Sequence, residues 1–186
     1  MNSSIKFYSA LGALLCVFAG TSSSIANTTY NFTSQRWGLD RKYQKQEVRF
    51  QTNEKPGTII ISTSKKYLWL VLGNGKALRY GIGVGRDGFQ WSGTERISRK
   101  AAWPDWRPPK EMREREPDLP AFMPGGPDNP LGARALYLGS TLYRIHGTAQ
   151  PWTIGTNVSS GCIRLTNENV IDLFRRADVG AKVIVQ

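Results

Sequence analysis

Apolar residues recur at strand-like spacing through residues 58–101. Residues 58–62 and 66–72 are rich in β-branched and aromatic side chains, and residues 77–84 alternate apolar side chains with arginine or glycine. Such runs, and a period of two, are typical of β-strands. The Gly73-Asn74-Gly75 sequence favours a tight hairpin, because Asn-Gly readily adopts the positive φ of a type I′ turn. These patterns predict a sheet built from hairpins.

The strand pattern continues through the second half of the chain, together with one amphipathic helix. Four further segments are predicted to be extended: residues 93–101, 133–139, 142–147 and 181–185. Residues 168–177 place apolar side chains three and four positions apart, with Thr166 or Asn167 as the N-cap and Gly180 beyond the end. Many strands with one strong helix predict a mainly β fold.

A proline-rich segment interrupts this pattern at residues 101–130. It holds eight of the ten prolines in the chain, and proline removes a hydrogen-bond donor from a strand ladder, so the segment is not core strand. Residues 109–116 are predicted to form one short helix that begins at a proline. Long insertions in compact domains are often lids or binding loops. We therefore expect this segment to be a lid or insertion that borders a functional site elsewhere in the domain, with a plain surface loop as the alternative.

The N-terminus has the layout of a secretory signal peptide. Lys6 precedes an apolar run over residues 7–20, and Ser24-Ile25-Ala26 is a suitable cleavage site. The run is shorter than the ~18 apolar residues that span a bilayer, so we expect residues 1–26 to be removed, no stable membrane span to remain, and the protein to be exported to the periplasm or cell wall. Residues 27–55 are polar and predict an arm or linker, and residues 56–186 are predicted to form the folded domain.

Charge and cysteine content narrow the class of partner. The net charge of +11 favours polyanions, but export argues against nucleic acid, so an anionic wall polymer or membrane surface fits better. Cleavage would also remove Cys16 and leave Cys162 as the only thiol in a compartment where disulfides normally form. An unpaired cysteine there calls for an explanation, and nucleophilic catalysis supplies one.

Cys162 lies sixteen positions after His146, the only histidine in the chain. A thiolate attacks where a thiol does not, and histidine is the usual base that removes the thiol proton. The glycines and proline between the two residues predict a strand, a loop and a return to the site. Ser159, Ser160 and Gly161 form a small, flexible approach to Cys162, where a substrate carbonyl can reach backbone N–H groups. A buried cysteine and an unrelated histidine are the simpler alternative.

The local sequence favours the catalytic interpretation. His146-Gly147-Thr148, followed by Ser159-Ser160-Gly161-Cys162-Ile163-Arg164-Leu165, resembles the signature of the L,D-transpeptidase catalytic domain family, also called the YkuD family. The resemblance covers roughly residue 56 to the C-terminus and implies a β-sandwich-like fold with its site at one end of a sheet. It also implies peptidoglycan stem peptides as substrates, cut before the terminal D-amino acid and passed to an amine of another stem or of an outer-membrane protein.

The resemblance implies a role for each residue that matches the motif. Cys162 is the nucleophile, His146 the base, and the Gly147 carbonyl the group that orients the histidine. The Gly161 and Cys162 amides would hold the oxyanion. The remaining candidates contact substrate: Arg164, which would bind a carboxylate unless it forms a surface ion pair, Ser159 at the family's Ser/Thr position, Ser160 where many members have a second histidine, Tyr143 and Trp152. No metal or other cofactor is expected.

Three alternatives stay open at this point. A hydrolytic version of the same family would trim tetrapeptide stems, because water and an amine compete for one thioester. A non-catalytic wall-binding module would have kept only the fold. A cysteine amidase or endopeptidase of the wall is disfavoured, since in the best-known such class the cysteine precedes the histidine, and here the order is reversed.

Overall fold

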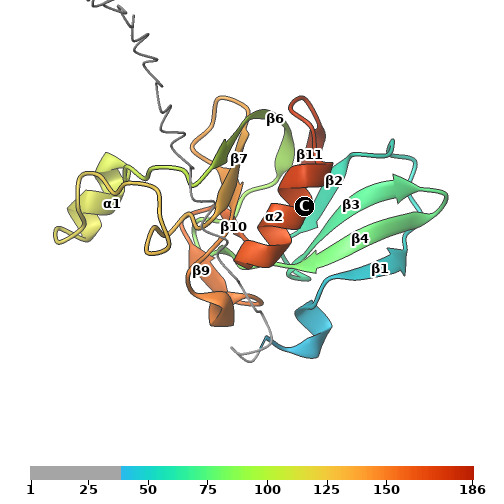
Figure 1. Ribbon diagram of the computed structural model, residues 1–186, viewed down its shortest axis with the longest axis horizontal. Coiled ribbons are helices and arrows are strands. Elements are labelled where there is room, and N and C mark those ends of the chain that lie inside the picture. Colours follow the sequence, from blue (N-terminus) through green and yellow to red (C-terminus); the bar gives the residue numbers. More distant parts are fainter. Residues whose placement is uncertain (1–38) are drawn as a thin grey trace, which may run out of the picture. The chain divides into compact units, whose positions relative to one another are not determined.

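The structure is a computed structural model that describes residues 39–186, so the expected signal peptide and the first part of the expected arm lie outside the described residues. Its largest feature is a nine-stranded mixed sheet (Figure 1) in the order β1-β4-β3-β2-β11-β6-β7-β8-β10, beside a two-stranded sheet of β5 and β9. The elements in chain order are η2 (Arg41–Tyr43), β1 (Gln46–Arg49), β2 (Ile59–Ser62), β3 (Tyr67–Gly73), β4 (Lys76–Gly81), β5 (Val84–Gly85), β6 (Gly93–Ala102), α1 (Lys110–Arg115), β7 (Arg134–Leu138), β8 (Arg144–His146), η3 (Pro151–Thr153), β9 (Asn157–Ser159), β10 (Ile163–Arg164), α2 (Asn167–Arg176) and β11 (Lys182–Val185).

The predicted hairpin between the second and third apolar runs is confirmed. β3 and β4 pair antiparallel, and the turn between them has φ values of 52° at Asn74 and 69° at Gly75. A register shift between Val71 and Gly73 marks a bulge beside the turn. The third apolar run does not stay one strand: β4 ends at Gly81, and Val84 starts β5, which pairs with β9 next to the site.

A strand appears inside the segment predicted to be an arm. β1 pairs antiparallel with β4 from Gln46 opposite Arg79 to Arg49 opposite Lys76, at the edge of the large sheet. Its side chains are exposed except for the half-buried Val48. The apolar pattern missed this strand because an edge strand is held mainly by backbone hydrogen bonds and needs little apolar surface.

β6 joins the two parts of the large sheet. Its first half, up to Arg96, pairs with β11, and its second half, from Ile97, pairs with β7, with a register shift between Ile97 and Arg99. Strands of both parts contribute to one hydrophobic core. This arrangement confirms the mainly β, sandwich-like fold predicted from the sequence. The core includes these fully buried side chains: Ile59, Leu68, Tyr80, Leu136, Ile145, Ile163 and Leu173.

The predicted C-terminal helix is α2, and it packs against β7 and β8. Thr166 is its N-cap and accepts a hydrogen bond through its side chain from the Asn169 N–H at 3.2 Å. Such a cap satisfies one of the free N–H groups of the first turn. Val170 and Leu173 are buried in the core. The helix follows directly on β10, so its packing fixes the strand that follows the candidate nucleophile.

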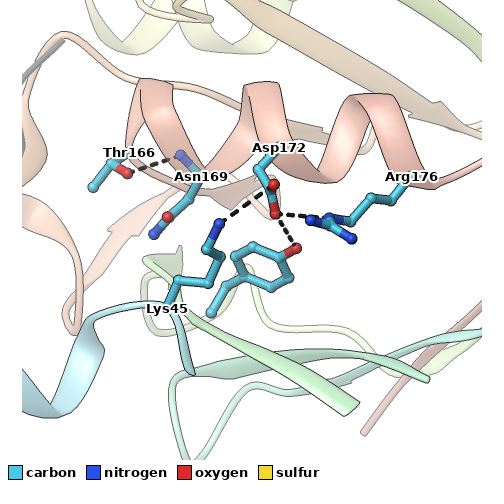
Figure 2. A network of polar contacts seen from close by, with 6 residues as sticks. Lys45, Thr166, Asn169, Asp172 and Arg176 are labelled. Carbon is cyan, nitrogen blue, oxygen red and sulfur yellow. Dashed lines mark hydrogen bonds and ion pairs between the residues drawn. The ribbon is translucent and has the colours of Figure 1, made fainter. Parts of the chain in front are cut away.

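Asp172 ties α2 to two other parts of the chain (Figure 2). Its carboxylate accepts hydrogen bonds from the Tyr80 hydroxyl at 2.8 Å and from Arg176 Nε at 3.1 Å, and it pairs with Lys45 Nζ at 3.3 Å. Burial pushes the pKa of Asp172 up, but these hydrogen bonds and the charge of Lys45 outweigh it and hold the pKa below its ordinary value. We call Lys45, Tyr80, Asp172 and Arg176 the Asp172 clasp.

The proline-rich segment forms a long excursion between β6 and β7 that carries α1 (Figure 1). The predicted short helix over residues 109–116 is confirmed, with Pro109 as its N-cap and no buried residue. Trp106 and Met123 exchange two backbone hydrogen bonds of 2.8 Å, which close the excursion on itself. No helix among residues 39–186 is long and apolar enough to cross a membrane.

Candidate active site

The candidate catalytic residues lie on and next to two neighbouring strands, His146 at the end of β8 and Cys162 directly before β10. β10 pairs parallel with β8, with Ile163 opposite Ile145 and Arg164 opposite His146. Both isoleucines are buried in the core. Because side chains alternate along a strand, the residues on either side of each isoleucine lie on the opposite face. Those four residues, Arg144, His146, Cys162 and Arg164, all line one pocket of about 630 Å³.

The histidine is buried and oriented by the backbone. His146 is only 4% exposed, and its Nδ1 lies 2.5 Å from the carbonyl oxygen of Gly147. A carbonyl can only accept, so Nδ1 carries the proton and Nε2 of the neutral ring is the basic nitrogen. The structure thus contains the contact with Gly147 that the family resemblance implied.

Burial keeps this histidine neutral. It is the largest cause that lowers the pKa of His146 to about 3, the charge of Arg164 adds to the effect, and the Gly147 carbonyl opposes it. Burial likewise raises the pKa of the Cys162 thiol above its ordinary value, against the charges of Arg144 and Arg164. The resting pair is therefore a neutral thiol and a neutral imidazole. Such a pair works by general-base removal of the proton during attack, without a preformed thiolate and imidazolium.

Cys162 is partly exposed in the pocket and forms no disulfide. Its Sγ contacts the carbonyl oxygen of Leu142 at 3.9 Å. The sulfur therefore stands in the pocket next to the strand that carries the histidine.

The loop before Cys162 is held by Ser159. The Ser159 hydroxyl donates to the Cys162 carbonyl at 2.6 Å and accepts from the Gly161 N–H at 3.2 Å. This differs from two expectations. Ser159 is predicted to contact substrate; it does line the pocket, but its hydroxyl is used inside the loop. The Gly161 amide is predicted to hold an oxyanion, but it already donates to Ser159. Of the two predicted oxyanion donors, only the Cys162 amide has no such bond to Ser159.

Gly161 cannot be another residue without strain. Its φ is 105°, and a Cβ at this position would lie 2.4 Å from Cε1 of the Tyr143 ring. The first value favours glycine and the second excludes a side chain. The small residue predicted from sequence is thus required both by backbone conformation and by close packing.

The other predicted contact residues divide into two groups. Tyr143, Ser160 and Arg164 line the pocket. Trp152 is not among its lining residues and lies on η3, 58% exposed. The predicted role of Trp152 in the cleft therefore has no support in this arrangement, because η3 holds it outside the pocket.

Arg164 is placed to meet a carboxylate. Its NH1 donates to the Thr153 hydroxyl at 3.2 Å, its Nε is buried with no hydrogen-bond partner within residues 39–186, and no described carboxylate forms an ion pair with it. A guanidinium without a counter-ion beside a pocket is able to bind an anion. The surface ion pair considered as its alternative role is absent from the described residues.

Other lining residues were missed by sequence reasoning. Arg144 precedes His146 by two positions, so strand alternation alone would have placed it on the same face. The proline-rich insertion was expected to border the site, and the structure confirms this: the residues it contributes to the pocket are Trp106, Pro109, Glu111, Met112, Arg115, Glu116, Leu119 and Pro130. Their identity could not be predicted, because nothing in the sequence shows how the insertion folds back.

The family model and the curated relatives give the same family. The model of the L,D-transpeptidase catalytic domain (YkuD) matches residues 56–185. The probable L,D-transpeptidase YbiS of Escherichia coli strain K12 is 39% identical over 135 residues, which are 68% of this chain and 43% of YbiS. The probable L,D-transpeptidase ErfK/SrfK of the same strain is 44% identical over 110 residues, 55% of this chain and 34% of that protein. The chain thus matches less than half the length of these relatives.

Solved structures agree on the fold. A Brucella melitensis protein described as a probable carnitine operon oxidoreductase is 46% identical, with a TM-score of 0.54, and the match covers 83% of this chain and all of that one. An L,D-transpeptidase from Mycobacterium smegmatis is 19% identical, with a TM-score of 0.52, and the match covers 69% of this chain and 58% of that one. The second likeness shows a shared fold. With the family match over residues 56–185, the chain belongs to the L,D-transpeptidase catalytic domain family.

Proposed function

We propose that the protein is a peptidoglycan L,D-transpeptidase that works through a Cys162 thioester. One observation carries the proposal: a neutral His146, oriented by the Gly147 carbonyl, lines the same pocket as Cys162, which directly precedes the strand paired in parallel with the histidine's strand. The paired strands limit the movement of the two groups relative to each other, which is what acyl transfer requires of a nucleophile and its base.

The first half-reaction forms the thioester. Nε2 of His146 takes the thiol proton as the sulfur attacks the carbonyl that precedes the terminal D-amino acid of a tetrapeptide stem. The sulfur–carbon bond forms, the carbon–nitrogen bond breaks, and the proton passes from His146 to the departing amine. The Cys162 amide faces the developing oxyanion, an interaction worth about 2.7–4 kcal/mol in comparable sites.

The second half-reaction transfers the acyl group. The amine of an acceptor attacks the thioester carbonyl and gives a proton to His146, the new carbon–nitrogen bond forms as the carbon–sulfur bond breaks, and the proton returns to the sulfur. The acceptor is either the amine of another stem, giving a cross-link, or an amine on an outer-membrane protein, giving a tether.

The charge of the pocket supports an anionic peptide as donor. Arg144 and Arg164 flank the cysteine on the two strands, and no described carboxylate pairs with either. Stem peptides carry free carboxylates, which a guanidinium binds through two parallel hydrogen bonds. The net charge of +11 and the signal-peptide pattern of residues 1–26 support a reaction in the periplasm, close to the anionic cell wall.

The test is turnover of a defined tetrapeptide stem by the purified protein, with products identified by mass spectrometry. We expect cross-linked product and the free D-amino acid from the wild type, and neither from Cys162→Ala at unchanged thermal stability. Tripeptide alone, without cross-links, would show a hydrolase. Absence of a covalent carbapenem adduct on Cys162 in the wild type would show a binding module.

A further inference from the structure

Trp91 contacts the loop that carries Cys162 from outside the sequence motif. It lies in the connection between β5 and β6, and its indole Nε1–H donates to the Gly161 carbonyl at 2.8 Å. Its ring stacks on Tyr143, with 4.5 Å between ring centroids and 6° between the ring planes. The indole is therefore fixed in orientation by one hydrogen bond and one stacked partner.

The accepting carbonyl shares a peptide unit with the amide of Cys162. In a planar trans peptide the C=O and the N–H of the following residue point in opposite directions. A donor that fixes the Gly161 carbonyl thereby fixes the direction of the Cys162 N–H. The next carbonyl, that of Cys162 itself, is fixed by the Ser159 hydroxyl at 2.6 Å. The backbone on both sides of the cysteine is thus held by side chains.

The packing around Gly161 makes this control effective. A Cβ on Gly161 would lie 2.4 Å from the Tyr143 ring, so the stacked pair of Trp91 and Tyr143 lies directly against the glycine backbone. Gly161 also has a φ of 105°, outside the usual range of other residues. With no side chain of its own to anchor it, this peptide depends on its hydrogen bonds for its orientation.

We propose that Trp91 is a positioning residue for acyl transfer, which aims the Cys162 amide at the oxyanion by holding the Gly161 carbonyl. This rests on the proposed role of Cys162 as the nucleophile. The consequence is specific: loss of the indole donor slows attack on a carbonyl, which passes through an oxyanion, but not alkylation of the same sulfur, which does not.

The experiment compares two reactions of Cys162 in Trp91→Phe and in a protein with 3-benzothienylalanine at position 91. Phenylalanine keeps an aromatic ring, and the benzothienyl group keeps the size of the indole but has sulfur in place of N–H. Trp69→Phe is the matched control, since Trp69 lies in β3, stacks on Phe50 and does not line the pocket. The probes are p-nitrophenyl acetate for acylation and iodoacetamide for alkylation.

In acylation, the sulfur bonds to the acetyl carbon, p-nitrophenolate leaves, and the thiol proton passes to His146. We expect both Trp91 replacements to slow this step by about 10- to 100-fold, somewhat less than the loss of a whole oxyanion donor. Alkylation should stay within about twofold of the wild type. Trp69→Phe should change neither rate.

Two results would overturn the inference. Acylation at the wild-type rate would show that the indole donor does not aim the amide, and an equal fall in acylation and alkylation would show a collapsed loop. The proposed function is judged separately by stem turnover in the wild type. If the wild type does not turn over stems but the Trp91 variants lose acylation selectively, the role of Trp91 stands and the proposed function fails. If the wild type turns over stems but the Trp91 variants acylate normally, the proposed function stands and the role of Trp91 fails.

Discussion

At the residue scale, the chemistry of the site depends on burial more than on charge. Desolvation pushes both His146 and Cys162 toward the neutral form, whereas the positive charges of Arg144 and Arg164 lower the pKa values of both groups. A positive charge disfavours imidazolium and favours thiolate. The arginines therefore add to the effect of burial at His146 and oppose it at Cys162, where burial remains the larger cause and the thiol rests in its neutral form.

A pH profile of thiol reactivity tests this neutral resting state. Because burial raises the pKa of Cys162 and lowers that of His146, we expect alkylation by iodoacetamide to increase about tenfold per pH unit from pH 5 to 8. N-acetylcysteine should react faster than Cys162 at pH 7. Mass spectrometry of the Cys162 peptide gives the rates. A plateau of high reactivity at pH 5–6 would instead reveal a thiolate–imidazolium pair.

Gly161 offers a second test at the same scale, with Gly88 as the matched control. Both have positive φ values, 105° and 80°, but a Cβ at Gly88 meets nothing within 4 Å, whereas one at Gly161 meets Tyr143. We expect Gly88→Ala to cost about 1 kcal/mol of unfolding free energy and Gly161→Ala about 2–3 kcal/mol. Urea unfolding measures both.

Only Gly161→Ala should also lose acyl transfer, because only that glycine adjoins the nucleophile. Equal stability losses in the two variants would mean that Tyr143 moves aside at little cost.

At the scale of elements, α1 in the excursion between β6 and β7 lines the pocket without burying a side chain of its own. α1 has no buried residue, yet Glu111, Met112 and Arg115 line the pocket. Arg86 and Arg115, from different segments, both lie over the Phe89 ring, at 4.7 and 5.1 Å from its centroid. These contacts join the excursion to the pocket wall at modest energetic value, in keeping with a part that serves binding.

Replacement of residues 110–115 by a Gly-Ser segment of equal length separates these roles. We expect the KM for a tetrapeptide stem to rise about tenfold, equivalent to about 1.4 kcal/mol of binding, because part of the pocket wall is lost. The melting temperature should hardly change, since α1 buries nothing. Acylation by p-nitrophenyl acetate, which is too small to need the wall, is the control. An unchanged KM would reduce the excursion to a surface loop.

The sequence predicted the elements well where apolar pattern decides structure. The hairpin turn at Asn74, the helix from Asn167 and the strand that delivers His146 all appear within a few residues of their predicted bounds. The apolar pattern missed β1 because three of its four residues are polar or charged and its pairing is through the backbone. Within the site, His146 and Cys162 could be proposed as a catalytic pair from their chemistry, but the contact of Trp91 could not be predicted, since seventy residues separate it from the glycine it contacts.

At the scale of the whole molecule, two groups make stability sensitive to acid. The pKa of His146 falls from 6.5 to about 3 on folding. Between these two pH values the folded state therefore binds fewer protons than the unfolded state. Its contribution is complete above pH 6.5 and is lost as the pH falls toward 3. The pKa of Asp172 is also lowered, so the contribution of the Asp172 clasp is lost below about pH 4.

The two groups affect stability in different pH ranges. Between pH 6.5 and 5 the change comes from His146, the only histidine, and not from Asp172. We expect the wild type to lose about 2 kcal/mol of unfolding free energy between pH 7 and 5, and His146→Gln to show a nearly flat profile over that range. Asp172→Asn should keep the wild-type slope there and become flatter only below pH 4. Urea unfolding at stepped pH gives each profile. A wild-type profile that is flat between pH 7 and 5 would contradict the buried, neutral histidine.

β2 and β11 lie side by side in parallel, with Ile59 opposite Val183 and Ile61 opposite Val185. β11 also pairs with β6, so it separates two strands that precede it by many residues. During synthesis the middle of the large sheet therefore cannot close until β11 has been made. A chain halted short of residue 182 lacks the strand that joins β2 to β6, and contacts this distant in sequence form slowly. A nascent chain without β11 therefore leaves the facing edges of β2 and β6 without their shared partner strand.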